Sequence, residues 1–156
     1  MHQNVQRVVD AAADLGLTIE VRTFPEGTKT AADAAAAIGV EVGQIVKSLV
    51  FAVDGHVVMA LVSGSNQLDE RKLAAAAGGA KAGRVDADAV REATGFPIGG
   101  VPPFAHVTSL PVFVDPDLLS WDEVWAAAGT WNDVFGIAPE DLVRATGGEV
   151  IDLRRA

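Results

Sequence analysis

The sequence predicts a mixed α/β domain in which a hairpin-based, largely antiparallel or mixed β-sheet is flanked by helices. Three observations favour this class. Two long apolar segments flank Asp54-Gly55, a dipeptide typical of a tight hairpin turn. Alanine-rich segments with helical spacing lie on either side of this hairpin. The regular strand–helix alternation of a doubly wound fold is absent, and the 156 residues fit one domain, residues 1–156.

The first part of the chain predicts a helix, a strand and a second helix. Apolar residues recur at helical spacing at positions 5, 8, 9, 12 and 15, and Gly16 suits the end of that helix. Residues 18–24 alternate apolar and polar side chains, as a half-buried strand does, and residues 24–27 form a turn. Thr30 is a suitable N-cap for the next helix and Gly39 a suitable C-cap.

The central hairpin is predicted over residues 45–53 and 56–62. Both arms are almost continuously apolar, so we expect two central strands that are covered on both faces. Two helices should come after it. One opens at Leu68-Asp69-Glu70 and runs to Gly78, and a shorter one covers residues 86–94, with Asp86 as its cap.

The last part of the chain mixes short elements. We expect a loop over residues 95–103 and a short strand over residues 111–115, whereas residues 121–128 fit either a strand or a helix. Pro139 suits the first turn of a last helix, which should end at Gly147-Gly148. A final strand is expected at Val150-Ile151.

Composition excludes several functions. The formal charge of −9 argues against a sequence-independent duplex binder, although one local basic patch can still meet one end of a nucleic acid. The chain has no cysteine, which excludes thiol chemistry, and its three histidines lack metal-ligand spacing. We therefore expect no metal and no other cofactor. Since no apolar run is long enough to span a membrane and no export signal is recognisable, we expect a cytoplasmic protein without membrane contact.

Lys47 is the first candidate for a functional residue. Together with Ser48 it lies near the start of the most apolar segment, residues 45–62. Because an unpaired ammonium group is costly to bury, its side chain must reach water, find a partner or have a lowered pKa. Two interpretations remain open. Either Lys47 lies at a strand end with its ammonium in water, or it points into a cleft and binds an anion or a polarised carbonyl group.

The second candidate is the segment GFPIGGVPPF, residues 95–104. Gly99 and Gly100 allow the backbone to approach a ligand closely, and Pro102-Pro103 stiffen the end of the segment. Such a loop can direct peptide N–H groups toward a developing oxyanion. The alternative is a structural turn that requires a positive φ at one of the two glycines.

Taken in order, these segments resemble the family of YbaK and prolyl-tRNA-synthetase-associated editing domains. The resemblance extends from about residue 18 to residue 153. It rests on TAADAA (30–35), IVKSLVF (45–51) before the hairpin, the segment 94–104, VD (114–115) and AG (128–129). The family implies a single α/β domain with a mixed, barrel-like sheet surrounded by helices. It also implies an aminoacyl-tRNA deacylase, which hydrolyses the ester of mischarged aminoacyl-tRNA and so serves translation fidelity.

The resemblance also implies which residues form the site. The family's lysine and its small or polar follower match Lys47 and Ser48. Its glycine–proline loop matches Gly99 and Pro103. An aromatic residue on the preceding segment matches Phe24.

Three further residues complete the expected substrate-binding set. Thr30 opens the first matching segment, and His106 lies just after the proline loop, where it borders the pocket or plays an ordinary surface role. Asn132 stands where many relatives have a histidine, a departure that bears on which amino acid is preferred. The amino acid is expected to be small, such as Ala, Ser, Thr or Cys.

The mechanism that fits these residues needs no protein nucleophile, because an aminoacyl ester is already activated. The site must place a water molecule and stabilise the oxyanion. Backbone N–H groups of Gly99 and Gly100 suit the oxyanion. Lys47 binds the phosphate or ribose of the acceptor end, or assists the oxyanion. In the family the substrate's own 2′-hydroxyl helps to organise the attack.

The expected partners are the acceptor end of a mischarged tRNA and an aminoacyl-tRNA synthetase. One alternative is a non-catalytic module of the same fold that holds a small ligand or a tRNA end. Another is a regulatory domain, against which Lys47 and the paired glycines argue. Basic residues in the middle of the chain form either a local positive patch or a solvated helix face: Arg71, Lys72, Lys81, Arg84 and Arg91.

Overall fold

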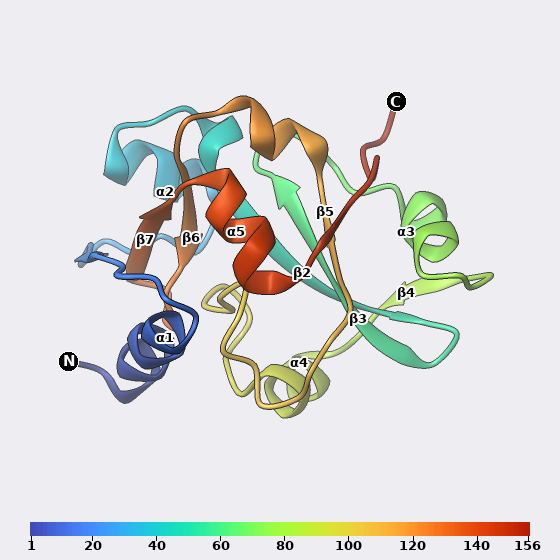
Figure 1. The fold of residues 1–156 in the computed structure, drawn as a ribbon, viewed down its shortest axis with the longest axis horizontal. Helices are drawn as coiled ribbons and strands as arrows, with labels where there is room; N and C mark the ends of the chain where they lie inside the picture. The colour runs from blue at the N-terminus through green and yellow to red at the C-terminus, as the bar shows by residue number, and fades with distance from the viewer.

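The computed structural model describes residues 1–156 and contains eight strands in two sheets (Figure 1). The strands are β1 (Val21–Thr23), β2 (Val46–Val53), β3 (His56–Ser63), β4 (Ala82–Arg84), β5 (Val112–Val114), β6 (Val124–Ala127), β7 (Asp133–Ile137) and β8 (Glu149–Val150). The larger sheet has the order β4-β2-β3-β5-β8 and the smaller one β1-β7-β6. The mixed α/β class is confirmed, but the barrel-like sheet is in fact two sheets that do not close.

The β2–β3 hairpin crosses the middle of the molecule (Figure 1). It is antiparallel from Val46 opposite Ser63 down to Val53 opposite His56, so the turn holds two residues, as predicted. Asp54 and Gly55 both have positive φ, at 49° and 86°, which is the type I′ turn that matches the twist of a hairpin. β5 pairs parallel with β3, and β8 parallel with β5, so the sheet is mixed.

The hydrophobic core lies on both faces of β3. Met59 and Leu61 belong to a large cluster that also contains residues from three helices, and Ala60 and Val62 belong to a second cluster on the opposite face. This alternation follows from the two-residue period of a strand. The prediction of burial on both faces therefore holds for β3. It is wrong for β2, because residues 47–50 are only partly buried.

The helices are α1 (Gln3–Asp14), α2 (Ala31–Ile38), α3 (Glu70–Ala76), α4 (Ala87–Thr94) and α5 (Pro139–Thr146). Their predicted caps are confirmed. Thr30 Oγ accepts a hydrogen bond from the Asp33 N–H, and Asp86 accepts one from the Ala89 N–H. Gly39 and Gly147 end their helices in the left-handed conformation. None of the five helices has the length and apolar character required to cross a membrane.

The differences from the predicted elements lie in the short strands. The segment 121–128 contains a strand, β6, rather than a helix, and its partner β7 was not predicted. β7 is five residues long and includes Gly136, so its local sequence is a weak strand signal. It forms because it pairs on both sides, with β1 and with β6.

Gly55→Ala tests the hairpin turn. A Cβ at Gly55 would meet no atom within 4 Å, so the cost is the left-handed backbone alone, and the free energy of unfolding should fall by about 1–2 kcal/mol. The matched control is Gly83→Ala in β4, where space is also free and φ is not left-handed. Urea denaturation should show no loss for the control. Equal losses in the two variants would contradict the type I′ assignment.

Candidate functional site

The outer edge of β2, which faces away from β3, is paired only near its two ends. Phe51–Val53 pair with β4, and Ile45, just before the strand, makes an isolated bridge to Trp125 in β6. Residues 46–50 between them have no strand partner on this side. We call this stretch the β2 gap. It explains why β2 is less buried than its sequence suggests.

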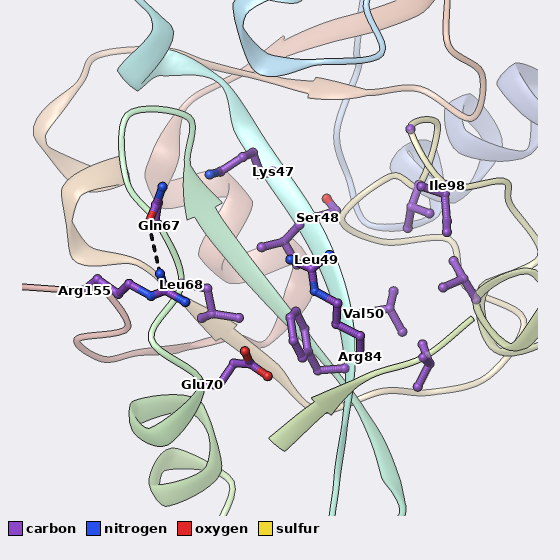
Figure 2. Close-up of a pocket in the computed structure, with 15 residues that line it drawn as sticks. Lys47, Ser48, Leu49, Val50, Gln67, Leu68, Glu70, Arg84, Ile98 and Arg155 are labelled. Carbon is purple, nitrogen blue, oxygen red and sulfur yellow. Dashed lines mark hydrogen bonds between the residues drawn. The ribbon is translucent and has the colours of Figure 1, made fainter. Parts of the chain in front are cut away.

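Two cavities adjoin the β2 gap. The first, of about 470 Å³, lies between β2, β4 and residues 67–70. The second, of about 420 Å³, lies between β2, β6 and the start of α2. Six residues line both cavities, from β2 and from the loop that covers it: Lys47, Ser48, Leu49, Ile98, Gly99 and Val101. The structure thus brings Lys47 and Gly99 to one hollow. Figure 2 shows the first cavity, with Lys47 and Ser48 leaving β2 in different directions.

The Lys47 ammonium is half-buried and donates a hydrogen bond to the backbone carbonyl of Asn66. Burial lowers the pKa of Lys47 below its ordinary value, and the nearby Asp115 carboxylate opposes that shift. The first interpretation, a lysine at a strand end with its ammonium in water, therefore holds only in part, because the group is half-exposed and also has a carbonyl partner. The cation is held in the cavity wall by one backbone carbonyl, and the Asp115 carboxylate acts on it only through its charge.

The buried Asp115 carboxylate holds Asn66, the hydrogen-bond partner of Lys47, in position. It is only 1% exposed, and its two oxygens accept three hydrogen bonds. Oδ2 accepts from the Ser63 N–H at 3.1 Å and from the Asn66 side-chain amide at 2.8 Å, and Oδ1 accepts from the Asp117 N–H at 2.9 Å. Asp115 thus fixes Asn66, whose carbonyl in turn receives Lys47.

Two buried polar atoms in the wall of the second cavity lack a hydrogen-bond partner. They are the Ser48 hydroxyl and the Trp125 indole N–H. Such groups each cost about 1–3 kcal/mol, and native proteins leave few of them without a reason. Both belong to residues beside the β2 gap, which marks this region as a candidate site independently of Lys47.

Gly99 and Gly100, in the loop over residues 95–103, have different roles. The Gly100 N–H donates to the Pro97 carbonyl at 2.9 Å, and Gly99 between them has φ of 88°. The Gly99 N–H makes no hydrogen bond within the chain. The expectation that both N–H groups face an oxyanion is corrected for Gly100, because its N–H closes the turn and the residue lines neither cavity.

Gly100 has a packing role instead. A Cβ there would come within 2.9 Å of the Thr130 backbone, and one on Gly99 within 2.8 Å of Trp131. The absence of side chains lets the loop lie directly on the segment 129–131. Trp131 also donates its indole N–H to the Ile98 carbonyl, which holds the loop over the β2 gap.

Of the remaining residues expected to bind substrate, some line a cavity and others do not. Thr30 lines the second cavity. Pro103 is buried away from both cavities, and His106 also lies outside them, with its Nε2 hydrogen-bonded to the Pro102 carbonyl at 2.7 Å. Burial lowers the pKa of His106. These contacts indicate a structural role for the proline segment.

Phe24 and Asn132 meet each other but line neither cavity. The Asn132 side-chain amide donates to the Phe24 carbonyl at 3.0 Å, and the Phe24 N–H donates to the Asn132 carbonyl at 2.8 Å. The pair closes the corner between β1 and β7. The expectation that they form the pocket wall is not met for these two cavities, because the Asn132 amide is bonded to the Phe24 backbone and the Phe24 ring lies against the Arg22 guanidinium.

Sequence reasoning missed several cavity residues. Trp125 was in a segment of undecided structure, and Ile98 carries no chemical signal of its own. Gln67 and Arg155 approach the first cavity only through the packing of distant segments. Of the five basic residues considered as a patch, only Arg84 lines either of the two cavities. No group of three metal-ligating side chains is gathered in the structure.

Residues 25–145 match the aminoacyl-tRNA editing domain family. The chain is 32% identical over 123 residues to the uncharacterized protein YwhH of Bacillus subtilis, covering 79% of this chain and 78% of YwhH. It is 31% identical over 122 residues to the multifunctional Ser/Thr-tRNA deacylase ProXp-y of Escherichia coli K12, covering 75% and 73% of the two chains. The crystal structure of a candidate trans-editing enzyme for prolyl-tRNA synthetase superposes with a TM-score of 0.94 at 44% identity, over 100% of this chain and 99% of the other.

Asp115→Asn tests the support beneath Lys47. Both carboxylate oxygens accept hydrogen bonds, so an amide must turn its NH₂ toward a donor, and the free energy of unfolding should fall by about 3 kcal/mol. The pKa of Lys47 should fall further, because the charge that raises it is removed. Urea denaturation and an NMR titration of the Lys47 ammonium measure the two effects.

The control is Asp117→Asn. Asp117 also accepts from Asn66 but is 47% exposed and paired with Arg154, so its replacement should cost less than about 1 kcal/mol. A Lys47 pKa that does not respond to Asp115→Asn would show that the carboxylate does not act on the ammonium.

Proposed function

The chain belongs to the aminoacyl-tRNA editing domain family, and we propose that it is a trans-acting aminoacyl-tRNA deacylase. The enzyme would hydrolyse the ester bond that joins a wrongly attached amino acid to a tRNA. A deacylase and a candidate trans-editing enzyme among its relatives support this proposal. The observation that carries it is that Lys47 and Gly99, whose N–H makes no hydrogen bond within the chain, both line the two cavities at the β2 gap.

The proposed reaction is the addition of water to the ester carbonyl. The carbonyl carbon becomes tetrahedral, its oxygen takes a negative charge, and the bond to the ribose oxygen then breaks. The water supplies one proton to the ribose oxygen, and the products are free amino acid and uncharged tRNA. No protein nucleophile is needed, so the site's task is to position the ester and stabilise the charge.

In this proposal the Gly99 N–H donates to the oxyanion, while Lys47 contributes its positive charge to the oxyanion or to the adjacent ribose and phosphate. Partial burial strengthens both interactions, because water competes less in a hollow than on an open surface. The 2′-hydroxyl of the substrate would help to hold the attacking water. No metal or cofactor enters the scheme.

The second cavity suits the amino-acid side chain. Small apolar residues from α2 and β6 form much of its wall: Ala31, Ala34, Ala126 and Ala127. The unpartnered Ser48 hydroxyl and Trp125 N–H lie in the same wall. We propose a small amino acid such as Ala, Ser, Thr or Cys, and as partners the acceptor end of a tRNA and an aminoacyl-tRNA synthetase, in the cytoplasm.

Lys47→Ala tests the proposed chemistry. On a panel of tRNAs charged with Ala, Ser, Thr, Cys and Pro, the wild-type protein should hydrolyse at least one mischarged species. The variant should be slower by roughly 10²–10³-fold, in line with the loss of one group that stabilises the transition state. Release of radiolabelled amino acid measures the rate, and circular dichroism checks the fold.

The matched control is Lys81→Ala, which removes an exposed lysine whose side chain makes no hydrogen bond or ion pair and lines neither cavity. It should retain wild-type activity. A folded Lys47→Ala protein of full activity would refute the role of Lys47. Binding of charged tRNA without hydrolysis by the wild type would favour the non-catalytic module instead.

A further inference from the structure

The first cavity carries a local excess of positive charge. Lys47, Arg84 and Arg155 line it, and Glu70 is the one carboxylate residue among its lining residues. The whole chain has the opposite balance, with 12 lysines and arginines against 21 aspartates and glutamates. A cavity whose lining is positively charged, in a protein whose net charge is negative, is suited to an anionic ligand.

None of these cations forms an ion pair within the protein, and the two arginines have few other contacts. The three ion pairs of the structure join other residues: Lys72 with Asp152, Arg144 with Asp141, and Arg154 with Asp117. The Arg84 side chain makes no hydrogen bond, and the Arg155 guanidinium contacts only the side-chain oxygen of Gln67, at 3.3 Å. Their charges are therefore free to bind a partner.

The strand register places Arg84 on the same side of the sheet as Lys47. Side chains of Lys47, Leu49 and Phe51 leave the same face of β2, because alternate residues of a strand do so. Arg84 lies directly opposite Phe51 in β4, so it shares that face. Lys47 and Phe51 are four residues apart along the strand, which is about 13 Å. The partly buried side chain of Leu49, which also lines the cavity, thus lies between the two cations.

Arg155 approaches the same cavity from another segment. Its backbone N–H donates to the Gln67 carbonyl at 2.9 Å, so the end segment is fixed beside residues 67–70. Figure 2 shows Arg155 and Gln67 together, and Lys47 and Arg84 at separate points along the cavity. The three cations come from three distant parts of the chain and surround one hollow.

We propose that Arg84 and Arg155 bind backbone phosphates of the single-stranded 3′ end of an RNA that lies in the first cavity. This inference rests on the proposed function for the identity of the ligand. The apolar Leu49 side chain between the cations would contact the ribose or base of a nucleotide. The two cavities would then bind different parts of one substrate. The first would bind the nucleotides that precede the ester, and the second would bind the amino acid.

The test uses full-length Arg84→Ala and Arg155→Ala proteins and an uncharged fluorescent RNA hairpin with a single-stranded ACCA end. Anisotropy at low salt should show affinity reduced roughly fivefold in each variant, as expected for one partly exposed charge contact. The slope of log affinity against log salt should become shallower by about 0.7 per variant, the value for one phosphate of a single strand. The control is Arg91→Ala, which removes an exposed arginine of α4 outside both cavities and should change neither quantity.

A second arm separates phosphate binding from the chemistry. With aminoacyl-adenosine, which has no phosphate, both arginine variants should hydrolyse the ester at the wild-type rate. With charged tRNA they should show raised KM and unchanged kcat. Wild-type protein that hydrolyses neither substrate would refute the proposed function, while the binding assay would still test the two arginines.

The inference would be overturned by variants that bind the hairpin as the wild type does, by a control that loses affinity equally, or by an equal loss of activity on aminoacyl-adenosine. Competition by free ATP as strong as that by the RNA would also overturn it, because the cavity would then be a nucleotide site.

Discussion

The interruption in strand pairing along the outer edge of β2 is the constraint on which the rest of the structure depends. β2 is fixed on its inner edge by β3 over its whole length, so the strand is rigid. On the outer edge, residues 46–50 lack a strand partner. An unpaired edge offers backbone groups to any neighbour, and proteins usually cover or block such edges. Here the loop containing Ile98 and Gly99 approaches the edge without pairing to it, and hollow space remains on both sides.

The groups beside this gap are held in place by partners outside it. Lys47 is fixed through Asn66 by the buried Asp115, and the loop is fixed through Trp131 and the close packing of Gly100 on Thr130. In the proposed reaction, groups that are already oriented need not reorganise when charge develops on the substrate. The low solvent access that favours such chemistry also lowers the pKa of Lys47.

The sequence predicted those features that depend on neighbouring residues. The hairpin at Asp54-Gly55 and the cap at Thr30 follow from local backbone chemistry, and both are found in the structure. Lys47 was identifiable because an ammonium in an apolar strand needs an explanation. Features that depend on distant contacts were not predictable in this way. β7 forms through its two strand partners, and Arg155 reaches the first cavity only because its segment pairs with Gln67.

The central claim is that one ligand occupies both sides of the β2 gap. The most direct measurement is NMR mapping with 3′-aminoacylamino-adenosine, in which an amide replaces the ester and prevents hydrolysis. We expect the largest amide shifts at residues 47–50 and 98–101, on both segments at the same ligand concentration. Shifts confined to one of these segments, or centred on a surface remote from β2, would contradict the account.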